Sequence, residues 1–393
     1  MPSYFRFAGI AGAVLASGAA LTACGSSSSA GSADATATRS ANSRVENVTI
    51  TSANGCQVSS PSLPAGALTF KVTNTDAAAV SEVELQSGDR IVGEKENLPP
   101  GFSGSFVVNV DAGTYTLYCP GAAKENTTLT VTGTAGPSSS SSARVLLTSG
   151  TKDYAAYVTT QVGYLVSTVK ALDAALNGHN LSAAQAAYDK ARPYYEKIEP
   201  VAESFTVGRN NLDADIDARA NDVAPSQWEG FHRIEKGLFE DKSLGGLAPY
   251  GAGLLANVKK LQRLTTNLTY QPYELANGAG ELLDEVATSK ITGEEERYSH
   301  IDLLDVEAND EGAEQAFAAL QPGLTKIDAS LSTTVAERFK ALDALLDTYR
   351  TDSNPSGFVY YGTLTRADKR TLAAAVTAVQ QPLSQVASKV AHA

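Results

Sequence analysis

The sequence predicts a protein of two folded domains, an N-terminal β-sandwich followed by an all-α helical bundle. Apolar residues alternate with polar ones in the first part of the chain, and they recur three and four residues apart in the second part. A segment rich in Gly, Pro and Ser, "GTAGPSSSSSA" at 133–143, separates the two patterns and is typical of a linker. The length of 393 residues is sufficient for two or three domains. We therefore place the β domain at 44–133, the linker at 134–148 and the helical domain at 149–393.

Residues 1–23 are typical of an export signal. Arg6 precedes an apolar run that is too short and too rich in small residues to span a bilayer. The following "LTAC" resembles the lipobox of bacterial lipoproteins, which implies cleavage before Cys24 and attachment of a lipid to its sulfur. The alternative is an ordinary signal peptide with a Cys at this place by chance. Residues 24–43, rich in Ser and Ala, are expected to be a disordered tether. We expect a mature protein in the periplasm or at the cell surface, anchored to the membrane by its N-terminal lipid.

The β domain is predicted from segments that alternate apolar and polar residues and are bounded by Gly, Pro, Asn and Asp. Short strands at this spacing suggest an antiparallel sandwich. Cys119 falls on the same side of its strand as Tyr115 and Leu117, so its sulfur is expected to point inward. In an exported protein, Cys56 and Cys119 should either form a disulfide or bind a metal. The predicted strands are residues 68–74, 105–110, 114–119 and 128–133.

The helical domain is predicted from long amphipathic runs. Breaks such as "NGHN" and "SNPSG" separate these runs. Long helices joined by short connections indicate a bundle. The runs include residues 153–176, 252–268, 324–350 and 366–391.

The charge balance excludes nucleic acid as a partner. The net charge is -12 and the pI is about 4.9, whereas binding to nucleic acid requires a basic surface. An acidic chain attracts cations instead. The sequence shows no Ser-His-Asp order, G-x-S-x-G motif, Walker loop or dinucleotide fingerprint, so no catalytic residue is assigned.

The stretch "WEGFHRIEKGLFED" at 228–241 contains the sharpest candidate site. On a helical wheel, His232 and Glu235 fall in the apolar arc together with Trp228 and Phe239. A buried ionisable side chain requires a partner. The two residues either satisfy each other in the core or bind a metal ion, since residues three apart share one helix face. The second His of the HExxH and HxxEH zinc motifs is absent.

Three other acidic segments are candidates. Glu196 and Glu199 fall away from the apolar stripe on the wheel, which favours a solvated face. Residues 211–219 contain three aspartates spaced by two, but they lack the Gly and distal Glu of a calcium loop. Residues 293–315 hold nine carboxylates against one Arg, which indicates either a solvated face or a rim that attracts cations. Carboxylates are suitable ligands for hard cations such as Fe(III).

The order of these motifs resembles one known family. "ENLPPG" and "GTYTLYC" in the β domain, with "YEKIEPVAESF", "WEGFHRIEKGLF" and "RYSHIDLLDVEANDEGAEQAF" in the helical domain, are together similar to the EfeO family, the extracytoplasmic component of EfeUOB iron-uptake systems. The resemblance covers roughly residues 44–390 and implies a cupredoxin-like domain followed by an imelysin-like HxxE domain. In the helical domain it implies metal binding by the HxxE motif and an acidic cluster, which are His232, Glu235, Glu196, Glu199, Asp213 and Glu295.

The resemblance also implies a metal site in the β domain, at Cys56, Cys119 and a carboxylate such as Glu82. Residues 44–133 contain no His, so the blue-copper site, which needs two His and one Cys, is absent. A disulfide between the two cysteines is the alternative to this site.

The family's function gives the main expectation. The protein would collect iron, as Fe3+ or Fe2+, and deliver it to a ferrous- or ferric-iron permease, with a haem peroxidase of the DyP type as a further partner. Copper and zinc are alternative metals. We expect no enzymatic activity, apart from help with the oxidation of Fe(II) by the β domain. Two functions compete with this one: an imelysin-like HxxE zinc metallopeptidase with a third ligand from elsewhere, and a structural lipoprotein without a high-affinity metal site.

Overall fold

The computed structural model describes residues 44–134 and 142–393, apart from Ser81, Asp89 and residues 208–209. The expectations for the export signal, for lipidation of Cys24 and for the tether lie outside the described residues. Among the described helices, none is long and apolar enough to cross a membrane.

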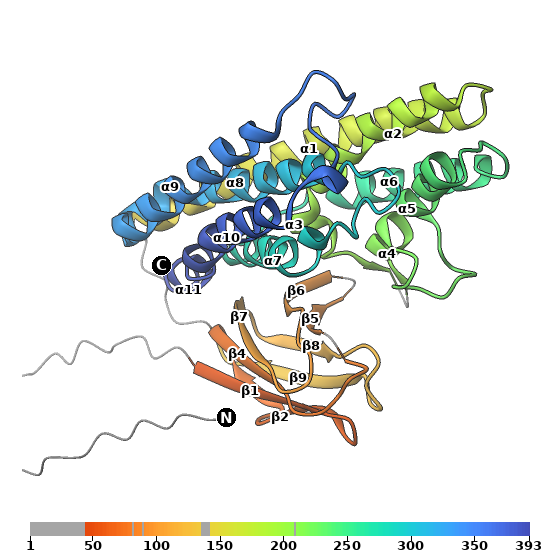
Figure 1. Ribbon diagram of the computed structural model, residues 1–393. Coiled ribbons are helices and arrows are strands. Elements are labelled where there is room, and N and C mark those ends of the chain that lie inside the picture. The colour runs from red at the N-terminus through yellow and green to blue at the C-terminus, as the bar shows by residue number, and fades with distance from the viewer. Residues whose placement is uncertain (1–43, 81, 89, 135–141, 208–209) are drawn as a thin grey trace, which may run out of the picture. The chain divides into compact units, whose positions relative to one another are not determined.

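The N-terminal part is built from strands, as predicted, but its sheets are mixed rather than antiparallel, because residues 44–50 run parallel to 68–74 and residues 62–64 run parallel to 130–132. The strands are β1 (Arg44–Thr51), β2 (Gly55–Val58), β3 (Ser62–Pro64), β4 (Gly66–Asn74), β5 (Val83–Ser87), β6 (Arg90–Lys95), β7 (Ser103–Val110), β8 (Gly113–Tyr118) and β9 (Asn126–Thr132). One sheet has the strand order β2-β1-β4-β7 and the other has the order β3-β9-β8-β5-β6 (Figure 1). Phe70 on β4 and Phe106 on β7 stack in the apolar core, with ring centroids 5.0 Å apart.

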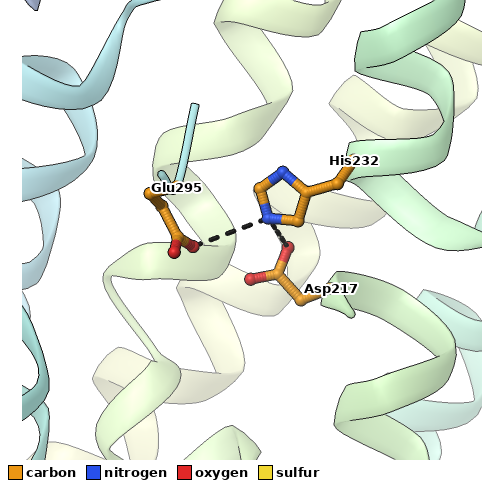
Figure 2. Close-up of side chains that lie close together, drawn as sticks. All are labelled: Asp217, His232 and Glu295. Atoms are coloured by element: carbon orange, nitrogen blue, oxygen red, sulfur yellow. Dashed lines mark ion pairs between the residues drawn. The ribbon is translucent and has the colours of Figure 1, made fainter. Parts of the chain in front are cut away.

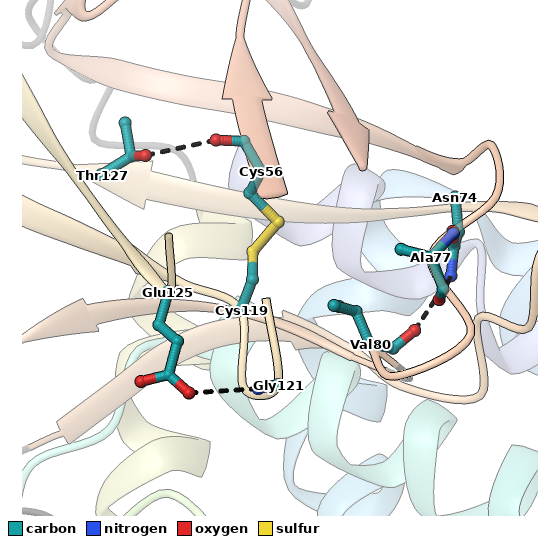
Figure 3. Close-up of a disulfide and its surroundings, with 8 residues drawn as sticks. All are labelled: Cys56, Asn74, Ala77, Val80, Cys119, Gly121, Glu125 and Thr127. Carbon is teal, nitrogen blue, oxygen red and sulfur yellow. Dashed lines mark hydrogen bonds between the residues drawn. A yellow bond between two sulfur atoms is a disulfide. The ribbon is translucent and has the colours of Figure 1, made fainter. Parts of the chain in front are cut away.

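A disulfide connects the two sheets. Cys56 lies on β2 and Cys119 directly follows β8, and both are buried (Figure 3). Their Cα atoms are 6.3 Å apart, within the range usual for a disulfide. Cys119 faces the core, as the strand pattern predicts. The structure therefore contains the disulfide alternative. The metal site predicted at the two cysteines is not formed, because neither sulfur is a free thiolate.

The C-terminal part is helical, as predicted, and α1 packs along α8 (Figure 1). Its longer helices are α1 (Ser142–Leu176), α2 (Leu181–Glu196), α6 (Ala248–Thr265), α7 (Pro272–Thr288), α8 (Asp302–Ile327), α9 (Ala329–Leu346) and α10 (Arg366–Leu383). Its shorter elements are α3 (Glu199–Ala202), β10 (Thr206–Val207), β11 (Asn210–Asn211), α4 (Leu212–Asp217), α5 (Gly230–Glu235), the π-helix η1 (Lys236–Glu240), the 3-10 helices η2 (Lys290–Thr292), η3 (Asp347–Tyr349) and η4 (Tyr361–Thr363), and α11 (Val386–Ala391).

Some boundaries differ from the sequence prediction. The run 324–350 is divided between α8 and α9, because Asp328 caps α9 by accepting a hydrogen bond from the backbone N–H three residues on. The run 366–391 likewise forms α10 and α11. Helix α1 begins at Ser142, so the predicted linker at 134–148 is too long.

The helix breaks between α2 and α3, and the two acidic residues beside this break, Glu196 and Glu199, lie in the interior. Segment 197–200 crosses very close to α7 and α8, because both helices have a glycine at the contact. A Cβ on Gly278 would lie 1.9 Å from a carbonyl oxygen of this segment, and a Cβ on Gly312 would lie 2.6 Å from another. Glu196 at the end of α2 and Glu199 at the start of α3 are consequently buried. The prediction that they form a solvated face is wrong, since the wheel assumed one continuous helix.

Candidate metal centre

Asp217, His232 and Glu295 converge in the helical domain (Figure 2). The Nε2 atom of His232 lies 3.5 Å from Asp217 Oδ1 and 3.5 Å from Glu295 Oε1. All three side chains are buried, and His232 Nε2 has no hydrogen-bond partner among the described residues. One imidazole nitrogen and two carboxylate oxygens within 4.8 Å of one another could hold a metal ion.

The local backbone explains why Asp217 meets His232. Asp217 is the last residue of α4, and α5 starts at Gly230 with a φ of 80°, a conformation that favours glycine. A Cβ at Gly230 would lie 2.2 Å from the carbonyl oxygen of Ile216, so only glycine allows α5 to begin this close to α4. Helix α5 then continues into η1, a short π-helix of a kind frequent at functional sites. Trp228 precedes α5 rather than opening the helix, as the wheel assumed.

Glu235 contacts the opposite side of the imidazole. Its Oε2 atom lies 3.3 Å from His232 Nδ1. Its Oε1 atom accepts hydrogen bonds from the backbone N–H groups of Tyr298 and Ser299, at 2.7 and 2.8 Å. This carboxylate therefore binds the ring nitrogen that faces away from Asp217 and Glu295. Carboxylates in this position orient a metal-binding His and fix its tautomer.

Arg192 balances much of the negative charge. Its guanidinium is fully buried and lies 5.4 Å from the centre of the Phe231 ring. Its nitrogens are no more than 3.0 Å from five carboxylates, which are Glu196, Asp217, Glu295, Glu296 and Asp305. The contact with Glu196 Oε1 is 2.6 Å long, but that oxygen is without a hydrogen bond of acceptable geometry.

Lys290 is the second buried cation of the cluster. Its ammonium lies 3.2 Å from Glu196, 2.5 Å from Glu199, 3.9 Å from Glu285 and 3.5 Å from Glu295. The side-chain amide of Asn309 donates further hydrogen bonds to Glu196 and Glu199, at 2.9 and 2.6 Å.

Burial and these contacts together shift the pKa values of His232, Asp217 and Glu295. Burial lowers the pKa of His232, but the Asp217 carboxylate and the contacts with Glu235 and Glu295 together outweigh this effect, and the pKa is raised to about 10. Burial raises the pKa of Asp217 to about 7, against the opposing charges of Arg192 and His232. For Glu295, Lys290 and the neighbouring cations outweigh burial and hold the pKa well below its usual range. The neighbouring cations thus favour the anionic form of Glu295.

The predicted residues of the helical domain lie in and around one cluster. His232 and Glu295 share one cluster, and Glu196 and Glu199 adjoin it through Lys290. Asp213 accepts a hydrogen bond from the Tyr195 hydroxyl, burial raises its pKa, and its charge interacts with those of Lys290, Glu196 and Glu295.

The sequence reading missed Asp217, although it stands in the acidic run at 211–219. The sequence reading also missed Arg192, Lys290 and Asp305, since nothing local marks them as buried. In the segment 293–315, the interpretation as a solvated face is wrong for the five carboxylates that are buried, which are Glu295, Glu296, Asp302, Asp305 and Asp310.

A separate carboxyl pair lies between α8 and α9. Asp310 is buried, and its carboxyl group shares a hydrogen bond with that of Asp343. Burial first, and then the charges of Asp343, Glu314 and Glu311, raise the pKa of Asp310 well above its usual value.

Glu82, the third residue of the metal site predicted in the β domain, is half-buried. Burial raises its pKa, and the charge of Asp213 raises it further. With Cys56 and Cys119 joined to each other, Glu82 has no thiolate partner for a metal.

Comparison with known proteins identifies the family. A family model described as "Imelysin" matches residues 150–386, and one described as "Cupredoxin-like domain" matches residues 14–131. The "Iron uptake system component EfeO" of Escherichia coli (strain K12) is 36% identical over 336 residues, which are 84% of this chain and 88% of the relative. The chain belongs to the EfeO family. The EfeO protein of Shigella flexneri shows the same identity and coverage.

Membership of the EfeO family confirms the two-domain fold class. The imelysin match spans the whole Asp217–His232–Glu295 cluster, and the cupredoxin-like match spans the disulfide. A solved structure, the dithionite-reduced auracyanin of Roseiflexus castenholzii, is 16% identical and covers 23% of this chain and 98% of its own, with a TM-score of 0.20. That likeness is too slight to support an argument. The EfeO relatives are named as components of an uptake system rather than as enzymes.

Proposed function

We propose that this protein captures an iron ion outside the cytoplasm and delivers it to a membrane permease. The observation that supports this function is the convergence of His232 Nε2, without a hydrogen bond, with the carboxylates of Asp217 and Glu295. Relatives named as iron-uptake components support iron as the metal. Imidazole nitrogen and carboxylate oxygen are both suitable ligands for iron.

In this proposal the three convergent residues bind the ion, and Glu235 orients His232 from behind. An ion reaches them through a cavity of about 130 Å³ that contacts His232, Glu235 and Glu295. Exposed side chains, including those of Asn221 and Arg297, also line this cavity, so it opens toward solvent.

Delivery requires that the protein stays near its permease. The lipobox at Cys24 would provide a membrane anchor, and residues 24–43 would let the folded part reach its partners. A ferrous- or ferric-iron permease and a haem peroxidase of the DyP type are the partners that this role implies. The metal would be iron in either oxidation state, with copper and zinc as competitors.

Peptidase activity is not part of this proposal. A zinc peptidase needs a carboxylate that is free to act as a base. Glu235 is the carboxylate of the HxxE motif, and it is held by two backbone N–H groups and by His232.

The test is a metal titration of the full chain with Fe2+ under anaerobic conditions and with Fe3+ supplied as its nitrilotriacetate complex. The variant His232→Gln should lower the affinity for iron at least about a hundredfold, as expected for loss of a direct ligand. His179→Gln, at an exposed His before α2, is the matched control and should bind as the wild type does. Equal affinity in the wild type and His232→Gln would contradict the proposal. Hydrolysis of a protein substrate by the zinc-loaded chain would favour the peptidase instead.

A further inference from the structure

Lys290 presents an unusual electrostatic arrangement. Its ammonium is buried, with only 2% of the residue exposed. Burying an ammonium group is costly unless anions compensate it. Glu196, Glu199 and Glu295 do so here, at 3.2, 2.5 and 3.5 Å. The lysine charge therefore depends on the same oxygens that could bind a metal ion.

The lysine and an ion bound at the neighbouring Asp217–His232–Glu295 cluster would compete for carboxylate oxygens, because Lys290 Nζ also lies 3.5 Å from Glu295 Oε1. Glu196 and Glu199 belong, with Asp217, to one group of oxygens within 4.8 Å of one another. Glu199 belongs to a second such group, and Lys290 Nζ contacts Glu285 of that group at 3.9 Å. Glu196 Oε2 accepts from both Lys290 and Asn309, so a metal ion at this oxygen would compete directly with the ammonium of Lys290.

Lys290 and Arg192 lie in different backbone settings, a single turn and a long helix. Lys290 starts the single turn η2, which ends at Gly293 in the left-handed conformation with a φ of 88°. Its side chain is long and unbranched, and it lies beyond the end of α7 at Thr288. Arg192 lies inside α2 and rests on the ring of Phe231, which restrains its guanidinium.

We propose that Lys290 is an internal counter-cation, which iron displaces from Glu196 and Glu199 as it binds. This inference rests on the proposed function, because it concerns how the same acidic centre loads and unloads. With the ion absent, Lys290 neutralises the glutamate pair and keeps the pocket folded. With the ion bound, the ammonium swings out toward solvent. Return of the ammonium favours release, and so limits the affinity to a level that permits delivery.

The first test compares Lys290→Met with Lys197→Met. Methionine keeps much of the length of the lysine stem and removes the charge. Lys197 lies beside Glu196 in sequence but pairs with Glu311, outside the cluster, and is the matched control. Titration with ferric nitrilotriacetate should show that Lys290→Met binds iron at least about tenfold more tightly than the wild type, while Lys197→Met does not differ. Equal or weaker binding by a folded Lys290→Met variant would overturn the inference.

The second test uses the wild-type chain, so it does not depend on folding of a variant. An amine-acylating reagent is applied with and without ferric nitrilotriacetate, and mass spectrometry measures modification of Lys290. Acylation should be slow without iron and at least about tenfold faster with iron, while acylation of Lys197 stays constant. Iron binding with unchanged protection of Lys290 would overturn this inference and leave the proposed function standing. A wild-type chain that binds no iron would overturn both.

Discussion

Glu235→Gln removes one negative charge behind His232 and leaves the shape of the side chain nearly unchanged. In the wild type, Glu235 Oε1 accepts two backbone hydrogen bonds, from Tyr298 and Ser299, and Oε2 faces His232 Nδ1 at 3.3 Å. If the Gln oxygen keeps the backbone bonds, its NH2 group faces the imidazole. His232 Nδ1 must then accept a hydrogen bond, so the neutral ring carries its proton on Nε2. In the wild type, Glu235 accepts the Nδ1 proton, so an ion that binds at Nε2 needs to displace only the Nε2 proton; in the variant, Nε2 keeps its proton and cannot bind the ion.

The expected magnitudes follow from these contacts. Hydrogen bonds to a charged acceptor contribute about 1.5–3 kcal/mol each, and neutral ones about 0.5–1.5 kcal/mol. Making two such bonds neutral should therefore lower the free energy of unfolding by about 2 kcal/mol. For a helical domain of this size, that loss corresponds to a decrease in Tm of about 4–8 °C. Loss of an orienting carboxylate should lower iron affinity about 10–100-fold.

Iron titration and thermal melting of Glu235→Gln give both quantities. Glu240→Gln is the control, because Glu240 lies on the adjoining turn η1, is exposed and pairs with Lys236. The control should leave affinity unchanged. A lower Tm with unchanged affinity in Glu235→Gln would show that the His–Glu pair is only a core feature. Complete loss of binding would show that Glu235 is itself a ligand, and would refute the orienting role.

Three further predictions concern other parts of the chain. Cys24→Ala should move the protein from the membrane fraction to the soluble fraction, and a variant that stays membrane-bound would contradict the lipid anchor. The denatured, unreduced protein with Cys24 blocked or removed should contain no free thiol. Replacing Cys56 and Cys119 by Ser should lower the free energy of unfolding by about 4 kcal/mol, because the disulfide closes a loop across a sequence separation of 63; two free thiols would exclude the disulfide. Because burial and Asp343 raise the pKa of Asp310, its stabilising proton is present below pH 4 and is lost as the pH rises through the raised pKa. Melting from pH 4 to pH 8 should therefore show Asp310→Asn equal to the wild type at pH 4 and more stable at pH 8, and parallel curves would contradict this.

The fold was predictable where a local pattern determines it. Strand alternation placed Cys119 in the core, and helical periodicity gave the bundle, because both depend only on which side chains face inward. Helix ends were less predictable. The cap at Asp328 divides a run that is apolar on both sides of it, and the start of α1 at Ser142 lies within a Ser-rich segment.

The site was only partly predictable, because it depends on contacts between distant segments. The wheel placed His232 and Glu235 in the interior correctly. It failed for Glu196 and Glu199, since the chain breaks after α2 and crosses two glycines that are far away in sequence. Only the resemblance to EfeO pointed to these two residues and to Glu295. Asp217 joins the cluster through the approach of α4 to Gly230, which no local pattern reveals.

The most direct test of the central claim is the position of iron in a crystal of the iron-loaded chain. Anomalous scattering measured on both sides of the iron absorption edge locates the ion independently of any assumption about its ligands. We expect the strongest iron peak at about 2.0–2.3 Å from His232 Nε2 and from carboxylate oxygens of Asp217 and Glu295, with Lys290 turned away from Glu199. A strongest peak away from His232, or one that leaves the distances within the Asp217–His232–Glu295 cluster unchanged, would contradict the account.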